Sequence, residues 1–266
     1  MIDDMSDNGK IYKYYSYNVY SLDVLRNNQL FFSHPSNFND PFDSSFNLLV
    51  KPYKKFCDAL HGIKNMSNAF EKQGIGCFTK ANKPDNKHFW SLYAGNYSGF
   101  ALEFDEDELN NLYPPLHLSR VNYFNEPMNL DNFETTFGFD YIDETYTVRK
   151  CIDTYPYDLM PLDRLFQYLF LYKDKSIWQN EVEYRMVIGE IVREHYKDRI
   201  IPNSHGYLLN LPQGAIKSIT FGYKISDTHK SEILEILKGK EIPVYIATPD
   251  IITTTTFHWG ITIKSI

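Results

Sequence analysis

Two glutamates and an arginine stand at every second position in SIWQNEVEYRMVI, residues 176–188. If this stretch is a β-strand, Glu181, Glu183 and Arg185 lie on one face, because side chains alternate between the two faces. Carboxylates roughly 7 Å apart on a strand can face one substrate, one polarising a nucleophile and the other stabilising positive charge. Arg185 can hold either carboxylate or a phosphate. The pattern also fits a solvated outer face with a weak Glu183–Arg185 pair.

A second polar cluster lies in FFSHPSNFNDPFD, residues 31–43. An apolar strand is expected to end there and to bring Ser33 and His34 to a loop with four amide and acidic side chains: Asn37, Asn39, Asp40 and Asp43. Pro41 favours an extended backbone at Asp40, and Asn and Asp side chains bond to nearby backbone amides. The loop therefore either presents Ser33, Asn39 and Asp40 to a ligand or is a self-capped turn.

Aromatic residues at helical spacing form a third cluster in HFWSLYAGNYSGFALEFD, residues 88–105. On a helix Trp90, Tyr93 and Tyr97 would share one face, and Gly95 and Gly99 would let a ligand or another backbone approach closely. Such a wall suits a nicotinamide, a nucleobase or another flat group. A stripe of core residues explains it equally well, because large aromatics are usually buried.

The composition indicates a folded chain and argues against several classes of function. Of 266 residues, 43% are hydrophobic and 16% aromatic, which is enough to bury a core. The net charge of −7, without a sustained basic run, argues against stable binding of duplex DNA. No apolar stretch approaches the roughly 20 residues that cross a bilayer, and the polar N-terminus lacks a signal-peptide pattern. We expect a cytoplasmic protein without a membrane partner.

No metal site or common enzymatic motif is predicted. The three cysteines are far apart and show no CxxC spacing: Cys57, Cys77 and Cys151. The eight histidines form no HxH or HExxH pattern, and GxSxG, P-loop and GxGxxG motifs are absent. A Mg²⁺-dependent nuclease stays open as a third function. It would need four acidic residues to converge: Asp40, Asp43, Glu181 and Glu183.

Hydrophobic periodicity predicts an α+β fold with a mixed, mostly antiparallel sheet flanked by helices, in a single domain over 1–266. The expected helices are 22–29, capped by Ser21, and 54–72, 87–97, 105–113, 159–175 and 226–239. The expected strands are 29–33, 74–80, 99–105, 119–124, the end of 176–188, 206–212, 215–226, 242–248 and 253–264. Residues 125–157 are a possible insertion.

Six motifs occur in an order that resembles the bacterial domain-of-unknown-function family 2971. They are YKYYS at 12–16, LFFSHPSNFNDPFD at 30–43, CFTK at 77–80, FWSLYAGNYSGFALEFD at 89–105, KDKSIWQNEVEYRMVI at 173–188 and ITFGYKIS at 219–226. The stretches FNDPFD and WxxExEYR are the most specific. Leu92 stands where that family usually has a histidine, which argues against a base at this place. The resemblance spans nearly the whole chain and implies an architecture rather than a reaction.

The layout also resembles, more weakly, that of the ADP-ribosyltransferases, in which an ExE pair follows a ligand loop and an aromatic segment. This resemblance implies that Glu183 stabilises the oxocarbenium-like ribose as nicotinamide leaves NAD. Glu181 would orient or activate the acceptor. NAD, as the substrate, would lie near Tyr14, Ser33 and the wall of Trp90 and Tyr93.

Two functions therefore stand first. One is an NAD-consuming ADP-ribosyltransferase-like enzyme, a toxin or phage-defence effector whose protein or nucleic-acid acceptor is unspecified. The other is a non-enzymatic binding or regulatory module. Burial of Glu183 in a cleft beside Trp90 and Asn39 would favour the enzyme, and exposure on an outer sheet face would favour the module.

Overall fold

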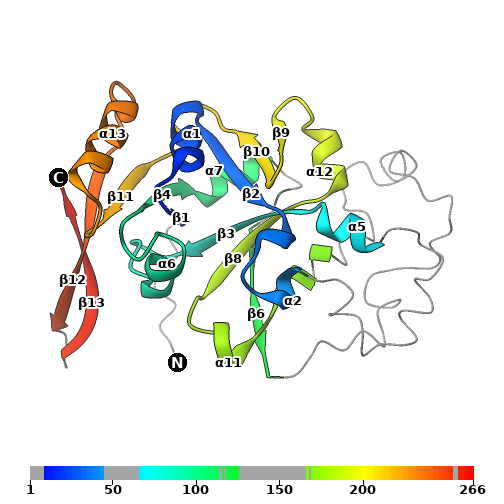
Figure 1. Cartoon of the computed structure of the whole chain (residues 1–266), viewed down its shortest axis with the longest axis horizontal. Helices are drawn as coiled ribbons and strands as arrows, with labels where there is room; N and C mark the ends of the chain where they lie inside the picture. Colours follow the sequence, from blue (N-terminus) through cyan, green and yellow to red (C-terminus); the bar gives the residue numbers. More distant parts are fainter. Residues whose placement is uncertain are drawn as a thin grey trace.

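The structure, a computed structural model, describes residues 9–44, 66–113, 116, 118–125, 166–167, 169–253 and 257–266. A large mixed sheet forms its centre, and helices pack against the sheet (Figure 1). β12 and β13 extend at one side as a long two-stranded ribbon. The predicted α+β fold with a mostly antiparallel sheet is confirmed.

The strands are short, apart from the last two. They run over Lys10–Tyr15 (β1), Gln29–Ser33 (β2), Gly74–Lys80 (β3), Phe100–Asp105 (β4), Ser119–Arg120 (β5), Asn122–Phe124 (β6), Tyr172–Asp174 (β7), Glu183–Ile188 (β8), Ile200–Asn203 (β9), Gly206–Asn210 (β10), Ser218–Gly222 (β11), Val244–Thr253 (β12) and Phe257–Ser265 (β13).

The helices connect these strands. They run over Val19–Asn27 (α1), Pro41–Ser44 (α2), Met66–Glu71 (α5), Lys87–Leu92 (α6), Glu106–Leu112 (α7), Lys175–Trp178 (α11), Glu190–His195 (α12) and Asp227–Leu237 (α13), with a 3-10 turn at Pro35–Asn37 (η1).

The strand order in the large sheet is β13-β12-β11-β4-β1-β3-β2-β10-β9, and β8 lies against β3 and β5. Within this sheet the pair of β11 and β12 is parallel, and the other pairs among the described strands are antiparallel. A separate parallel pair joins β6 to β7. Chain order and spatial order therefore differ, so that β1, β2, β3 and β8 meet in the middle although they come from distant parts of the sequence.

One edge of β3 is shared by two strands that part from each other. β1 pairs with the end of β3, Tyr12 opposite Thr79, and β2 pairs with its beginning, Ser33 opposite Ile75. The other edge of β3 pairs with β8 along its whole length. The residues of β3 around Cys77 have no described strand beside them on the first edge. A wedge thus opens between β1 and β2, and β8 closes it from behind.

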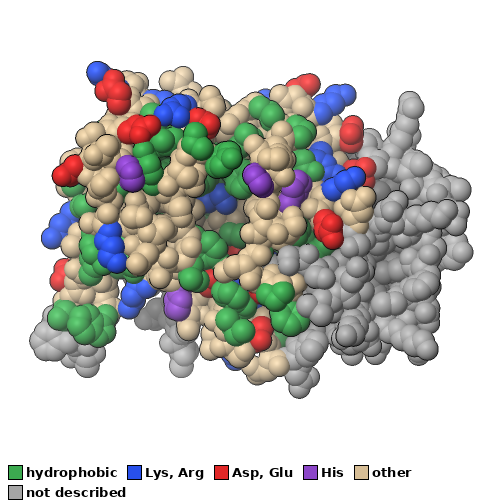
Figure 2. Space-filling view, in the orientation of Figure 1, with side chains coloured by type: hydrophobic (Ala, Val, Ile, Leu, Met, Phe, Trp, Pro, Cys, Tyr) green, Lys and Arg blue, Asp and Glu red, His purple; other side chains and the backbone are tan. Residues whose placement is uncertain are grey.

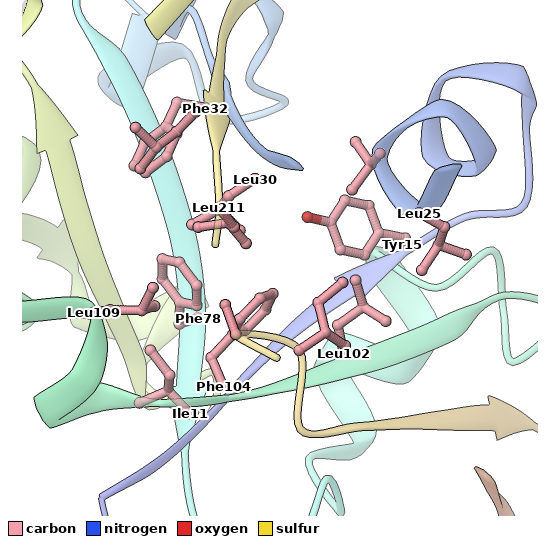
Figure 3. Packing of buried hydrophobic residues seen from close by; sticks show 14 of the residues in the cluster. Ile11, Tyr15, Leu25, Leu30, Phe32, Phe78, Leu102, Phe104, Leu109 and Leu211 are labelled. Atoms are coloured by element: carbon pink, nitrogen blue, oxygen red, sulfur yellow. The ribbon is translucent and has the colours of Figure 1, made fainter. Parts of the chain in front are cut away.

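The main hydrophobic core fixes the strands around this wedge. Figure 3 shows aromatic and aliphatic side chains of the core packed together, among them Phe32 of β2, Phe78 of β3 and Phe104 of β4. Leu25 of α1 joins the same cluster. Each buried Leu or Phe side chain contributes roughly 1.5–3 kcal/mol through removal from water. The site is therefore built on strands that the core holds in place.

Several predicted boundaries are wrong for local reasons. Helix α1 begins at Val19, and its cap is Asn18 rather than Ser21, because the Asn18 side chain accepts a hydrogen bond from the Ser21 amide at 2.9 Å. The helix expected over 159–175 ends earlier, since Tyr172–Asp174 is strand β7. Strand β9 and helix α12 were not predicted. Residues 54–65 and 126–157, on which other predictions fall, lie outside the described residues.

The capping box of α1 provides a test of these boundaries. We expect Asn18→Ala to destabilise the protein by about 1 kcal/mol, because it leaves a helix amide without a partner. Urea denaturation measures this change. The control Asn27→Ala alters the exposed last residue of α1 and should change stability by less than about 0.5 kcal/mol. Equal effects of both substitutions would contradict the assignment of the cap.

Candidate functional site

Four charged side chains form a buried network behind the wedge. Lys173 of β7, Glu181, and Glu183 and Arg185 of β8 are each no more than 3% exposed. Buried charges are stable only when they are paired and hydrogen-bonded. The reading of Glu183 and Arg185 as a weak, solvated pair is therefore wrong.

Glu183 lies at the centre of this network. Its two carboxylate oxygens accept hydrogen bonds from Arg185 Nε at 2.8 Å and Arg185 Nη2 at 3.0 Å, which makes a bidentate pair. Lys173 Nζ donates to Glu183 Oε2 at 3.2 Å and to Glu181 Oε2 at 3.0 Å. Lys173 thus bridges the two carboxylates. The predicted Glu181/Glu183 pair is real, but a cation that the sequence reading missed holds it together.

The local backbone explains why Glu181 reaches the network from outside the strand. Strand β8 begins at Glu183, and Val182 has a φ of 49°, in the left-handed region that a β-branched residue rarely adopts. The simple alternation expected over 181–185 is therefore wrong at Glu181. The Glu181 carbonyl accepts a hydrogen bond of 2.6 Å from Nδ2 of Asn86, and the side-chain oxygen of the same Asn86 caps α6. Strained backbone of this kind is concentrated at functional sites.

The environments of the two carboxyl groups drive their pKa values in opposite directions. Burial alone would raise the pKa of Glu183, but the charges of Arg185 and Lys173 outweigh it and lower the pKa to about 2. Burial raises the pKa of Glu181, because Lys173 offsets only part of that effect and Glu183 adds a like charge. Glu183 is therefore ionised at neutral pH, and Glu181 is the carboxyl group of the pair that protonates more readily.

The network borders a pocket of about 320 Å³ in the wedge, which we name the basic pocket. Lys13 and Arg185 are the charged residues among those that line it. Its remaining walls are Tyr14 of β1, Ser33 of β2, Asn37, Phe38 and Asn39 of the following loop, Ile75 and Cys77 of β3, and Phe89, Leu92 and Tyr93 around α6. Arg185 lies directly opposite Cys77 in the sheet, so both side chains face this pocket.

A second pocket of about 460 Å³, the aromatic pocket, adjoins the first. Four residues line both: Tyr14, Ser33, Asn37 and Tyr93. The rest of its lining is a mixture of aromatic, polar and aliphatic residues, and Asp23 is the acidic residue there. Figure 2 shows that this face of the molecule is hollowed near its middle and that a basic side chain lies deep in the hollow. Together the two pockets offer a long site with different chemistry at its two ends.

Tyr93 connects the pockets to the buried network. Its hydroxyl donates a hydrogen bond of 2.9 Å to Glu181 Oε1. Burial and the charges of Glu183 and Glu181 raise the pKa of Tyr93, so the hydroxyl keeps its proton. A ligand in either pocket would therefore touch a side chain that is bonded to the network.

The structure brings most of the predicted ligand-binding residues to these pockets. Tyr14, Ser33 and Tyr93 line both, and Asn39 lines the basic pocket. Glu183 lies behind the lining, hydrogen-bonded to Arg185, and so makes no direct contact with the space inside. Glu183 thus lies neither inside a cleft, as expected of an enzyme, nor on an exposed outer face of the sheet, as expected of a binding module.

Trp90 and Asp40 have structural roles. Trp90 is fully buried, its indole N–H donates to the Pro84 carbonyl at 2.6 Å, and its ring packs edge-on against Tyr14. It supports the wall from behind, as the core interpretation expects. Asp40 is also buried and accepts a hydrogen bond of 3.0 Å from the Phe42 amide at the start of α2, as expected of a self-capped turn. The side chain of Asp43 lies outside the described residues.

Sequence reasoning missed Lys13, Lys173 and Asn86. Lys173 fell inside the helix expected over 159–175, although Asp174 caps the next helix through a 2.7 Å hydrogen bond from the Ser176 amide. Asp is a favoured N-cap residue, and interpreting Asp174 as a cap would have ended the first helix earlier. Lys13 was not selected, because a single lysine among the aromatic residues of a strand matches no sequence motif.

The described residues contain no group of His, Cys, Asp or Glu arranged to hold a metal ion. Lys173 Nζ already lies within hydrogen-bonding distance of both Glu181 and Glu183. Over the same part of the chain, no helix is long and apolar enough to cross a membrane.

The depressed pKa of Glu183 predicts how its contribution to stability depends on pH. At pH 7 we expect Glu183→Gln to cost about 3–5 kcal/mol, because buried Arg185 and Lys173 lose a carboxylate that they share, and only Lys173 keeps Glu181. The ionised carboxylate stabilises the fold above the ordinary pKa of about 4.3, and this contribution is lost as the pH falls toward about 2. The difference from wild type should therefore shrink below about pH 4.3.

Urea denaturation at a series of pH values tests this expectation. The control Glu235→Gln removes a surface glutamate that pairs with Lys238 at 3.4 Å, and it should alter stability by less than about 1 kcal/mol. A difference between Glu183→Gln and wild type that stays constant from neutral to acidic pH would show that Glu183 is not held ionised.

Comparison with known proteins supports the family resemblance. Residues 89–186 match the model of the family described as "Protein of unknown function (DUF2971)". This segment includes Tyr93, Lys173 and the stretch from Glu181 to Arg185, but not β1 or the 31–43 loop. No curated protein and no solved structure matches the chain. The resemblance to the DUF2971 family is confirmed over residues 89–186, the part of the chain that carries the buried network.

Proposed function

We propose that the protein is an NAD-consuming enzyme of the ADP-ribosyltransferase type and that NAD binds in the wedge between β1 and β2. The observation that carries this proposal is the buried carboxyl pair beside the basic pocket, with Glu183 held ionised and the pKa of Glu181 raised. Pairs of acidic groups whose environments drive their pKa values apart are characteristic of acid–base catalysis.

The reaction needs what this pair supplies. When nicotinamide leaves NAD, positive charge develops on the ribose, and a permanently ionised carboxylate stabilises that charge. The acceptor must lose a proton, and a carboxyl group with a raised pKa is suited to taking it. Glu183 fits the first role and Glu181 the second. The acceptor would be a protein or a nucleic acid, as expected of a toxin or phage-defence effector in the cytoplasm.

Access to Glu183 follows from the same geometry. Arg185 lines the basic pocket and is bonded to Glu183 through two nitrogens. A ligand phosphate at Arg185 would compete with Glu183 for the guanidinium, because both are planar or multidentate anions that arginine binds well. Release from Arg185 is what contact between Glu183 and the ribose requires, because Glu183 lies behind the pocket lining.

The two pockets fit a dinucleotide in size and chemistry. Ligand pockets usually enclose about 300–1,000 Å³, and the two adjoining spaces are about 320 and 460 Å³. Aromatic side chains offer faces for flat rings, and the cations Lys13 and Arg185 suit phosphates.

The second candidate is a module that binds a nucleotide without changing it. Its support is that Glu183 already has its hydrogen bonds satisfied by Arg185 and Lys173, as in a purely structural network. The version of this alternative in which the ExExR face is solvated is excluded, because Glu183 is fully buried.

Nicotinamide release from NAD, measured with pure protein and candidate acceptors, separates these functions. We expect wild type to release nicotinamide and Glu183→Gln to lose at least about 100-fold in rate, the usual effect of removing one charge-stabilising group. Because Glu183→Gln also weakens the fold, Tyr93→Phe provides a milder variant. It removes the hydrogen bond to Glu181 and should slow release roughly 10-fold.

The surface substitution Glu235→Gln is the matched control and should leave the rate unchanged. Binding of NAD without release of nicotinamide by wild type would favour the binding module. Full activity in folded Glu183→Gln would show that Glu183 has no role in the reaction.

A further inference from the structure

Lys13 is a buried lysine for which the described part of the chain offers no hydrogen-bond acceptor. It lies in β1, only 8% of its surface is exposed, and it lines the basic pocket. Among the residues that the structure describes, none accepts a hydrogen bond from Lys13 or forms an ion pair with it. Its neighbours are ring faces: Nζ lies 5.3 Å from the centre of Phe78 and 5.7 Å from that of Tyr15.

Lys173 provides a direct comparison within the same site. It is buried to a similar degree, yet its Nζ donates to Glu181 and to Glu183. Burying an ammonium group without an anion is unfavourable, and such groups are rarely kept unless they bind something. Contact with aromatic ring faces recovers only part of the hydration free energy that the ammonium group loses on burial. Within the part of the chain that the structure describes, Lys13 therefore lacks the carboxylate partners that Lys173 has.

The groups that face Lys13 do not neutralise it. Cys77 of β3 stays a thiol, because burial and the nearby Glu183 charge raise its pKa. Glu183 acts on Lys13 only from a distance, and burial, the larger influence, lowers the pKa of Lys13. Arg185 of β8 adds a second cation to the pocket wall. The described residues that line the basic pocket include no carboxylate.

The neutral groups around Lys13 suit an anion. Ser33, Asn37 and Asn39 line the same pocket. The Ser33 hydroxyl donates to the His34 carbonyl and the Asn37 amide to the His205 carbonyl, so the Asn39 amide and the second N–H of Asn37 are the donors for phosphate oxygens. The adjoining aromatic pocket differs in charge, since its described lining includes the acidic Asp23 and neither lysine nor arginine, and it offers the rings of Tyr15, Tyr20 and Phe31. A ligand that fills both spaces would therefore carry its negative charge at one end only.

We propose that Lys13 is the anion-binding residue of the basic pocket and holds a phosphate or pyrophosphate group of the ligand beside Arg185. The neutral, flat part of the ligand occupies the aromatic pocket next to Tyr14 and Tyr93. The ligand class is a nucleoside phosphate. This inference rests on the proposed function for the location of the ligand, and it adds the group that anchors the ligand.

Calorimetric titration with inorganic pyrophosphate, ADP and uncharged adenosine tests the proposal. Wild type should bind pyrophosphate and ADP, and adenosine more weakly than ADP. Lys13→Met, similar in length and apolar, should weaken pyrophosphate and ADP binding roughly 10- to 100-fold, as expected for loss of one charge-assisted hydrogen bond. It should leave adenosine binding nearly unchanged.

Two further measurements separate anion binding from a structural role. Lys13→Met without ligand should melt at the same temperature as wild type or higher, because it removes an unpaired buried amine. Between the lowered pKa of Lys13 and the ordinary lysine value of about 10.4, pyrophosphate binding by wild type should take up protons. Titrations in buffers of different ionisation enthalpy detect this uptake, which Lys13→Met should abolish.

The control is Lys83→Met, because Lys83 is exposed at the surface and only 3.7 Å from Asp85. It should bind pyrophosphate as wild type does. Equal affinity of wild type and Lys13→Met for pyrophosphate, or no binding by wild type, would overturn the proposal.

The outcome is independent of catalysis. Pyrophosphate binding that depends on Lys13, without nicotinamide release, would support the anion site and contradict the proposed NAD-consuming activity. Nicotinamide release with the same KM for NAD in Lys13→Met and wild type would support the proposed activity and contradict the proposed anion site.

Discussion

The contact of Lys173 with two buried carboxylates is the interaction on which the site depends. Without this ammonium group, Glu181 and Glu183 would be like charges a few residues apart in a region of low dielectric, where such repulsion is strong. Arg185 and Lys173 together keep Glu183 ionised, and Lys173 limits the rise in the pKa of Glu181 that burial and the charge of Glu183 cause. The same contact ties β7 to the start of β8 and so holds the rear of the wedge together.

The wedge itself results from strand pairing. Because β8 occupies one edge of β3 completely, β1 and β2 must share the other, and they reach it at opposite ends. The gap between them is lined by residues that in a continuous sheet would be covered by a neighbouring strand. Lys13, Cys77 and Arg185 therefore reach a cavity instead of packed core, although each comes from a strand in the middle of the molecule.

The sequence predicted local features better than spatial ones. Strands 29–33 and 74–80 have the predicted bounds, because their apolar residues end at clear turn signals. The proximity of Glu181 and Glu183 was also predicted, although the reason was wrong: Glu181 lies outside β8, and Lys173 bridges the two carboxylates. Lys173 and Lys13 were missed because their importance comes from contacts with β8 and with the wedge, which depend on strand order. Trp90 and Asp40 were selected by residue type, and their burial could be seen only once the fold was known.

A crystal structure with bound ADP-ribose, which has the phosphates and ribose of NAD but lacks nicotinamide, tests the central claim most directly. The account predicts the diphosphate within hydrogen-bonding distance of Lys13 Nζ and Arg185, the adenine ring in the aromatic pocket, and the terminal ribose near Tyr93 and the Glu181–Glu183 pair. ADP-ribose bound elsewhere, or bound in the wedge with its phosphates directed away from Lys13, would contradict it.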